Sequence, residues 1–338
     1  MKLLFLPNVK IMAAVVAGLL GLNGSVGAVA VSIEWVDVGD VGNLADNIAG
    51  YGSVGYDYQI SKYEVTINQY TAFLNAVAVT DTYNLYNTFM GSKDNIKGIE
   101  RSGTDGSYSY SVIAESGNRP ITYVDWFDAA RFSNWLTNGQ VTGAQDASTT
   151  ETGSYTLNGA TSGIIVAGDG DYRMPTVDEW YKAAFYDPTK GKADDGDNYW
   201  DYAMRLDNLV DNSTSANYKD GDYATTQSPN YSQSINYLTD VGSYSDQDSY
   251  YGTFDQSGNV NEWTHSSDGE LRIRRGGGWG SSYIHLRESL LSDSFFDFEA
   301  TLEAPDVGFR LATTAVPEPS SLALFALGGV AVLMRRKR

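Results

Sequence analysis

Cysteine is absent from this chain of 338 residues. That absence excludes disulfide bonds, thiolate nucleophiles and metal sites that depend on sulfur ligands. Histidine is scarce too, with two residues, His265 and His285. A zinc hydrolase needs about three protein ligands, so two histidines argue against that class. Stability must come from core burial, hydrogen bonds or a bound hard cation.

Basic residues are few beside acidic ones: 23 Lys and Arg stand against 42 Asp and Glu, a formal net charge of −19. Such a surface repels nucleic acid and anionic lipid, so we expect no nucleic-acid partner. Aromatic residues are plentiful, with 24 Tyr and 7 Trp. Domains of this kind often bind carbohydrate or protein, although a large irregular core would use the same residues.

The first thirty residues have the pattern of a signal peptide. Lys2 and Lys10 precede and flank an apolar run over 11–22, and the small residues of 28–30 offer a cleavage site. The alternative is a membrane-spanning helix, but the run is short of the roughly 20 residues that a span needs. We therefore predict a signal peptide over 1–30 and export across the inner membrane.

The C-terminal segment 316–338 has three parts in order: Pro317-Glu318-Pro319, an apolar run over 322–334, and the basic end RRKR. This order resembles the PEP-CTERM sorting signal, and an ordinary tail anchor is the alternative. The resemblance implies an exosortase-type sorting protease as a partner. It also implies transient membrane association through the C-terminal helix, and a cell-surface or matrix location after cleavage.

The segment between these ends reads as one domain, 31–315, without an internal repeat or linker. Alternating residues over 31–40 and 56–65 predict strands, and 121–124 predicts a short third one. Three helices are predicted to begin after the capping residues Thr66, Asp125 and Thr176, the last in a capping box with Glu179. The segment 81–110 is predicted to be irregular. The stretch 187–248 is long for a loop and needs fixation, which a metal could supply.

Six ordered motifs carry a family resemblance: KYEVTINQYTAFLNAV, RPITYVDWFDAARFSNWL, YRMPTVDEWYKAA, SGNVNEWT, RRGGGW and DVGFRLA. Together they resemble the sulfatase-modifying factor family, the formylglycine-generating enzyme type. The resemblance implies an α+β, C-type-lectin-like fold, loop-rich, with a few helices packed on short antiparallel strands. It says less about activity, because one fold hosts several unrelated roles.

Formylglycine-generating members oxidise a substrate cysteine with copper held by two cysteines. Ser281 and about Leu286 stand at those two positions here. Copper(I) prefers thiolate ligands, so we do not expect copper, and we name no catalytic residue. A related branch uses iron held by three histidines, and this chain has two. A Ser/His/Asp set that includes Ser281 and His285 is arithmetically possible, but no serine lies in a Gly-x-Ser-x-Gly elbow.

The loop DQSGNVNEW has the composition of a hard-cation site. Asp255 and Glu262 supply carboxylates, and Gly258 lets the backbone bend. The carbonyls of Gly258 and Val260 can point the same way. By resemblance this is the family's structural calcium loop, with Asp255, Gly258, Val260 and Glu262 as the matching positions.

Asn217 and Tyr218 resemble the start of a second calcium site of the family. Its other ligands do not align, although Asp220 or Asp222 could serve. The alternative for Glu262 is a buried ion pair with one of three arginines: Arg274, Arg275 or Arg310.

Two functions follow. In the first, the protein is an exported, calcium-stabilised, non-catalytic module that binds an exopolysaccharide or a surface protein. In the second, it is an enzyme of the formylglycine-generating family, or of other chemistry in the same cleft. The missing cysteines favour the first.

Overall fold

The computed structural model of the chain describes residues 30–167, 170–191, 197–208, 211–268, 271–287 and 297–314. The predicted sorting tail and the predicted signal peptide, except Ala30, lie outside these residues. Within the described ranges, no helix is both long and apolar enough to cross a membrane.

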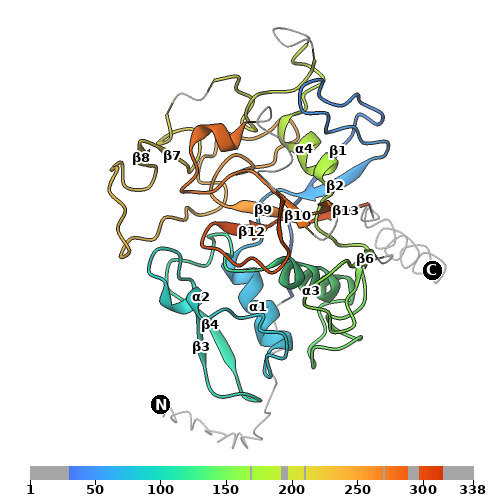
Figure 1. Cartoon of the computed structure of the whole chain (residues 1–338), viewed down its shortest axis with the longest axis vertical. Helices are drawn as coiled ribbons and strands as arrows, with labels where there is room; N and C mark the ends of the chain where they lie inside the picture. Colours follow the sequence, from blue (N-terminus) through green and yellow to red (C-terminus); the bar gives the residue numbers. More distant parts are fainter. Residues whose placement is uncertain are drawn as a thin grey trace, which may run out of the picture.

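Two sheets form the centre of the domain (Figure 1). The first is antiparallel, in the order β1-β2-β13, and joins the two ends of the domain. The second has the order β11-β10-β9-β12, and only β12 runs parallel to its neighbour, β9. Their bounds are β1 Trp35–Val38, β2 Tyr58–Ser61, β13 Ala312–Thr313, β9 Asn261–Asp268, β10 Leu271–Arg275, β11 Asp297–Glu299 and β12 Val307–Phe309.

Three helices pack around these sheets, and each begins after the capping residue that the sequence predicts. All three starts are capping boxes, whereas the sequence analysis predicted one, at Thr176. The boxes pair Thr66 with Gln69, Asp125 with Asp128 and Thr176 with Glu179, so side chains satisfy backbone N–H groups that the first turn leaves free. The helices are α1 Ile67–Val77, α3 Trp126–Thr137 and α4 Val177–Phe185. In Figure 1, α1 and α3 lie side by side. Ala183 of α4 packs in one cluster with Val38 of β1 and Ile60 of β2.

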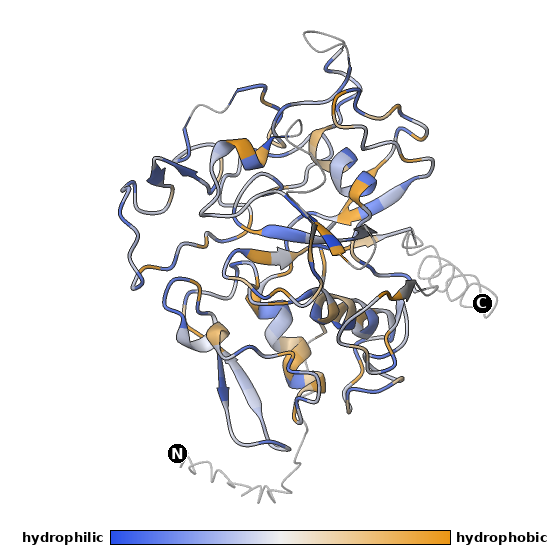
Figure 2. Cartoon of the chain, in the orientation of Figure 1, coloured by the Kyte–Doolittle hydropathy of each residue, from blue (hydrophilic) through white to orange (hydrophobic). Residues whose placement is uncertain are grey.

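Aromatic side chains hold α1 against α3. The ring of Phe73 lies 5.3 Å from those of Phe132 and Trp135, and Phe132 also contacts Phe309 of β12 at 5.4 Å. Figure 2 shows hydrophobic residues on α1, α3 and β12, whereas β9 and much of the long loops are hydrophilic. The many aromatic residues therefore serve a core, as one of the two interpretations of the composition required.

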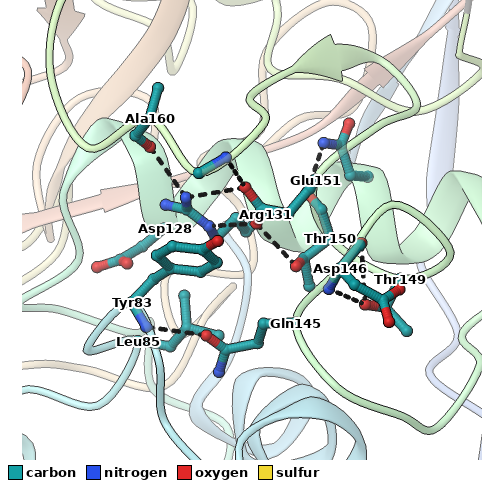
Figure 3. Close-up of polar contacts among 12 residues, drawn as sticks. Tyr83, Leu85, Asp128, Arg131, Gln145, Asp146, Thr149, Thr150, Glu151 and Ala160 are labelled. Atoms are coloured by element: carbon teal, nitrogen blue, oxygen red, sulfur yellow. Dashed lines mark hydrogen bonds and ion pairs between the residues drawn. The ribbon is translucent and has the colours of Figure 1, made fainter.

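A buried ion pair fastens the insertion after α3. Arg131 of α3 donates from Nε to Oε1 of Glu151 at 2.8 Å and from Nη2 to the carbonyl of Ala160 at 2.9 Å (Figure 3). The Arg131 guanidinium also lies 3.9 Å from the ring centre of Tyr83. Beyond it, the segment after α3 contains the short antiparallel pair β5 Tyr155–Thr156 and β6 Val166–Ala167.

Two local predictions were wrong. The segment 81–110, predicted to be irregular, contains α2 (Phe89–Ser92) and β3 (Ile99–Ser102), and β3 pairs with β4 (Ser109–Val112). Tyr110 of β4 is buried and donates to the carbonyl of Ala78, just after α1. The predicted strand 121–124 is absent: Pro120 forms one isolated bridge, and Tyr123 has a φ of 57°, which breaks the extended course.

The remaining short elements are β7 Lys219–Asp220, β8 Asp222–Tyr223 and the 3₁₀ helix η1 Tyr283–Leu286. The fold is α+β, with few helices, short strands and long loops.

Candidate functional site

Glu262 of β9 is fully buried and pairs with Arg310. Its Oε1 accepts from Nη2 of Arg310 at 2.7 Å, and its Oε2 accepts from Nε of Arg310 at 2.5 Å and from the indole of Trp180 at 2.7 Å. Arg310 is therefore the partner among the three arginines that the sequence offered. The arrangement is bidentate, which suits the planar guanidinium.

Asp255 lies beside this pair, in a left-handed backbone conformation with a φ of 61°. Its Oδ2 accepts from the backbone N–H of Gly242 at 2.6 Å. Burial raises the pKa of Asp255 to about 6, and the charge of Glu262 adds to that effect, while the Gly242 hydrogen bond and Arg310 oppose it. Burial and the nearby charge of Glu262 both disfavour the ionised form of Asp255, so a bound cation would stabilise that form.

Glu64 completes the cluster, and the sequence analysis missed it. Its Oε1 accepts from Nδ2 of Asn259 at 3.2 Å, while its Oε2 is buried and has no hydrogen-bond partner among the described residues. Burial raises the pKa of Glu64 well above its usual range, and the charges of Asp255 and Glu262 raise it further. Three carboxyl groups thus share the charge of one guanidinium. The motif KYEVT contains Glu64 and was the available signal.

The two predicted calcium segments lie against each other. Gly258 has a φ of 115°, and a Cβ there would lie 2.7 Å from the carbonyl oxygen of Asn217. That carbonyl accepts from the backbone N–H of Asn259 at 2.8 Å, and the side chain of Asn217 donates to the carbonyl of Tyr237 at 2.8 Å. Hydrogen bonds already hold these groups in one packed unit.

The other predicted ligands have defined places. Val260 is buried in the main core, and Tyr218 is buried in a smaller cluster with Leu286. The carbonyl of Tyr218 accepts from Nδ2 of Asn212 at 3.0 Å. Among the described residues, no three His, Cys, Asp or Glu side chains could hold a metal ion together. A Ca²⁺ ion here would need carbonyls and water for most of its ligands. The second carboxylate oxygen of Glu64, Oε2, is the kind of oxygen ligand that Ca²⁺ prefers.

The positions of the family's copper ligands lie close together. A Cβ on Gly277 would lie 2.8 Å from Cδ2 of Leu286 and 3.4 Å from Cβ of Ser281. The hydroxyl of Ser281 accepts from the backbone N–H of Gly278 at 3.0 Å. The two residues that the resemblance aligns with copper ligands are therefore neighbours, and neither side chain contains sulfur.

The histidines lie on different elements. His285, on η1, has its Nδ1 3.2 Å from the hydroxyl of Ser282, so its serine partner is not Ser281. His265, on β9, has its Nδ1 3.3 Å from the hydroxyl of Tyr155. Each has its own neighbours, as expected of ordinary hydrogen-bonded histidines.

Stacked aromatic rings cover the turn that contains Trp279. The ring of Tyr237 lies 4.8 Å from that of Trp279 at 16°, and Tyr231 stacks on Tyr237 at 5.4 Å. Tyr237 is buried, whereas Tyr231 is 46% exposed. One exposed ring is thus held in place by two others, a rigid surface of the kind that ligands contact.

Comparison with known proteins gives a family and a sorting motif. The family model described as a sulfatase-modifying factor enzyme 1-like domain matches residues 51–315, and the PEP-CTERM protein-sorting motif matches 315–338. The sorting motif is a signal for export and for exosortase-type processing. A comparison with curated proteins finds no match.

Solved structures with a similar fold include CarF, Treponema denticola variable protein 1 and PvdO from Pseudomonas aeruginosa. CarF is 20% identical, covers 83% of this chain and 98% of its own, and has a TM-score of 0.46. The Treponema protein is 19% identical over 82% and 94%, with a TM-score of 0.48. PvdO is 17% identical over 83% and 92%, with a TM-score of 0.44. The family match spans most of the chain, so the protein belongs to the sulfatase-modifying factor enzyme 1-like domain family.

Proposed function

We propose that this protein is a non-catalytic binding module at the cell surface or in the matrix, stabilised by Ca²⁺ and directed at a carbohydrate or protein ligand. The observation that carries the proposal is the pair Ser281 and Leu286, which replaces two copper-binding cysteines in a chain without any cysteine. The family oxidises a substrate cysteine with copper held by two thiolates, and this chain has no thiolate to hold the copper.

The aromatic stack supports a binding role. Tyr231 exposes its ring beside the turn of Trp279, and Tyr237 and Trp279 hold it there. Little conformational entropy would be lost when a ligand packs on a ring that is already fixed. The proposed sequence of events is export, transient membrane attachment through the C-terminal helix, and release to the surface or matrix by an exosortase-type protease.

The acidic cluster supports the calcium part. Asp255 and the free Oε2 of Glu64 offer oxygens, and the carbonyls of Gly258 and Val260 belong to the same loop. Glu262 is less available, because Arg310 and Trp180 use both of its oxygens. Asn217 and Tyr218 remain the proposed start of a second site.

Two measurements test the proposal on the purified protein. A glycan and protein array should show a ligand, and Tyr231→Ala should weaken its binding, whereas Tyr250→Ala, which alters a comparably exposed ring in another loop, should not. Elemental analysis should find calcium, and a chelator should lower the Tm. Bound calcium with no array ligand would overturn the binding role, and a ligand with no calcium would overturn the calcium part. An aldehyde formed from a sulfatase-type cysteine peptide with copper would overturn the non-catalytic role.

A further inference from the structure

A second aromatic surface lines a cleft of about 470 Å³ between the start of α2 on one side and β11 with the turn that follows it on the other. Its volume lies within the range of small-molecule sites, about 300–1,000 Å³. Three rings line it together with two carboxylates and an amide: Phe89, Tyr123, Phe298, Glu299, Glu303 and Asn87. Rings and acidic groups in one cleft are the combination that binds an organic cation.

Phe89 exposes its ring to the cleft, while Tyr123 is buried at 8% exposure and supports it from below. Phe89 is 41% exposed and lies 5.2 Å from Tyr123, whose backbone N–H donates to the carbonyl of Ala304 at 3.1 Å. Tyr123 has the left-handed φ of 57°, an uncommon conformation for a bulky residue and one that costs free energy. Such strain persists where surrounding contacts enforce it, and it clusters at binding sites.

The carboxylates have no cationic partner. Neither Glu299 nor Glu303 forms an ion pair within the described part of the chain. The charge of Glu303 also acts on two buried carboxyl groups, Asp125 and Asp128, and raises the pKa of each. Burial is the main cause that raises the pKa of Asp125 to about 7, and the charge of Glu303 adds to it. A cation in the cleft would relieve this repulsion.

Two of the aromatic rings that line the cleft already contact cationic side chains of this chain. The ammonium of Lys93 lies 4.6 Å from the ring centre of Phe89, and the guanidinium of Arg274 lies 3.5 Å from that of Phe298. Both are contacts of a cation with the face of a ring. The two basic groups lie against Phe89 and Phe298, while Glu303 has a hydrogen bond with Asn87 and neither acid forms an ion pair among the described residues.

We propose that this cleft binds an amino sugar, with the ammonium of a glucosamine unit between Glu299 and Glu303 and its ring against Phe89 and Tyr123. The flat rings fit the C–H face of a sugar, and the amide of Asn87 and the carboxylates can bind its hydroxyls. The strongly acidic surface favours a cationic glycan over an anionic one. This inference rests on the proposed binding role and names the ligand class.

Calorimetry on the purified protein tests it, at a slightly acidic pH where sugar amines are charged. A short glucosamine oligomer should bind, and an N-acetylglucosamine oligomer of the same length, which has no charge, should bind at least about tenfold more weakly. A lysine oligomer supplies the charge without the sugar and should also bind more weakly. Equal binding of the acetylated oligomer, or of the lysine oligomer, would overturn the proposal.

Variants locate the site. Glu299→Gln, Glu303→Gln and Phe89→Leu should each weaken glucosamine binding several-fold, while Asp246→Asn, which removes an exposed acid from another loop, should leave it unchanged. Glu299 is exposed, so its variant should fold normally. Unchanged affinity in Glu299→Gln and Glu303→Gln would overturn the site. An array that finds only uncharged glycans would overturn this inference while leaving the binding role intact.

Discussion

Arg310 and Glu262 meet side by side in the interior, joined by two hydrogen bonds of 2.5 and 2.7 Å. Arg310 also donates to the carbonyls of Ser61 at 3.0 Å and Phe254 at 2.8 Å. One guanidinium thus ties β9 to β2 and to the loop that leads to Asp255. Since both partners are fully buried, the pair gives the central sheets a fixed register and leaves neither charge alone.

Removing either Glu262 or Arg310 should strongly destabilise the folded domain. We expect Glu262→Gln or Arg310→Met to lower the free energy of unfolding by about 3–5 kcal/mol, because the remaining charge stays buried. Urea denaturation measures the change. Glu34→Gln, which breaks an exposed pair with Lys62, is the matched control and should cost at most about 1 kcal/mol. A loss of similar size in both would contradict the assigned role.

Glu64→Gln should have opposite effects with and without calcium. Without calcium it removes a buried charge that faces two other carboxylates, so the Tm should stay level or rise. With calcium the proposed ligand is weakened, so the rise in Tm on adding the ion should shrink. Thermal melts in chelator and in excess calcium compare the two states. A calcium response equal to that of the unaltered protein would remove Glu64 from the site.

Gly258→Ala should destabilise the domain by more than about 1–3 kcal/mol. The new Cβ would combine a strained φ with a contact of 2.7 Å to the Asn217 carbonyl. Gly42→Ala separates the two causes, because Gly42 has a φ of 80° but nothing within 4 Å of its Cβ position. Chemical denaturation of both variants should show the larger loss for Gly258. Equal losses would mean that the packing of the two loop segments contributes little.

Stability should fall as the pH drops from about 6.5 to about 4, in part because of His265. Burial, together with the charges of Arg173 and Arg272, lowers the pKa of His265 to about 4. Its pKa in the unfolded chain is about 6.5, so in this window the unfolded state binds a proton that the folded state does not. The loss at the acidic end is at most about 3 kcal/mol.

His265→Gln should flatten that part of the stability profile, as measured by denaturation at a series of pH values. His285→Gln is the control, because His285 is exposed on η1 and should leave the profile as it was. A slope that survives His265→Gln would assign the acid sensitivity to other groups.

Introducing cysteines at positions 281 and 286 should give the domain a copper site. The double variant Ser281→Cys, Leu286→Cys places two thiols beside Gly277, and we expect it to bind copper(I), whereas the unaltered chain should not. Each single variant should bind much more weakly than the double one. Copper titration in the presence of a reductant measures this. Tight binding by the unaltered chain would mean that it holds the metal through other ligands.

The sequence predicted what depends on neighbours along the chain. The three capping boxes each join residues three apart, so Thr66, Asp125 and Thr176 could be read directly as helix starts. The family motifs predicted the fold and brought Ser281 close to Leu286. The hairpin of β3 and β4 was missed because its strands are rich in Ser, Arg and Glu, and of their residues Ile99 and Tyr110 alone are buried.

Contacts between distant residues were harder to predict. Three arginines were equal candidates for Glu262, and only the pairing of β9 with β12 brings Arg310 to it. Glu64 meets Asn259 across 195 positions, so no local pattern marks its burial. The amino-sugar cleft likewise joins Asn87 to Glu303, and its two walls meet only in the folded domain.

The sheet β1-β2-β13 also bears on when the domain can fold. β2 pairs with β1 on one side and, on the other, with a strand some 250 positions further along the chain, where the N–H of Ser61 donates to the carbonyl of Leu311 at 2.8 Å. Arg310 must arrive with that last strand before Glu262 is neutralised. Contacts of such long range form slowly, because a long loop must close first. A polypeptide threaded through a membrane from its N-terminus would therefore cross unfolded and complete this sheet only after nearly the whole chain had emerged.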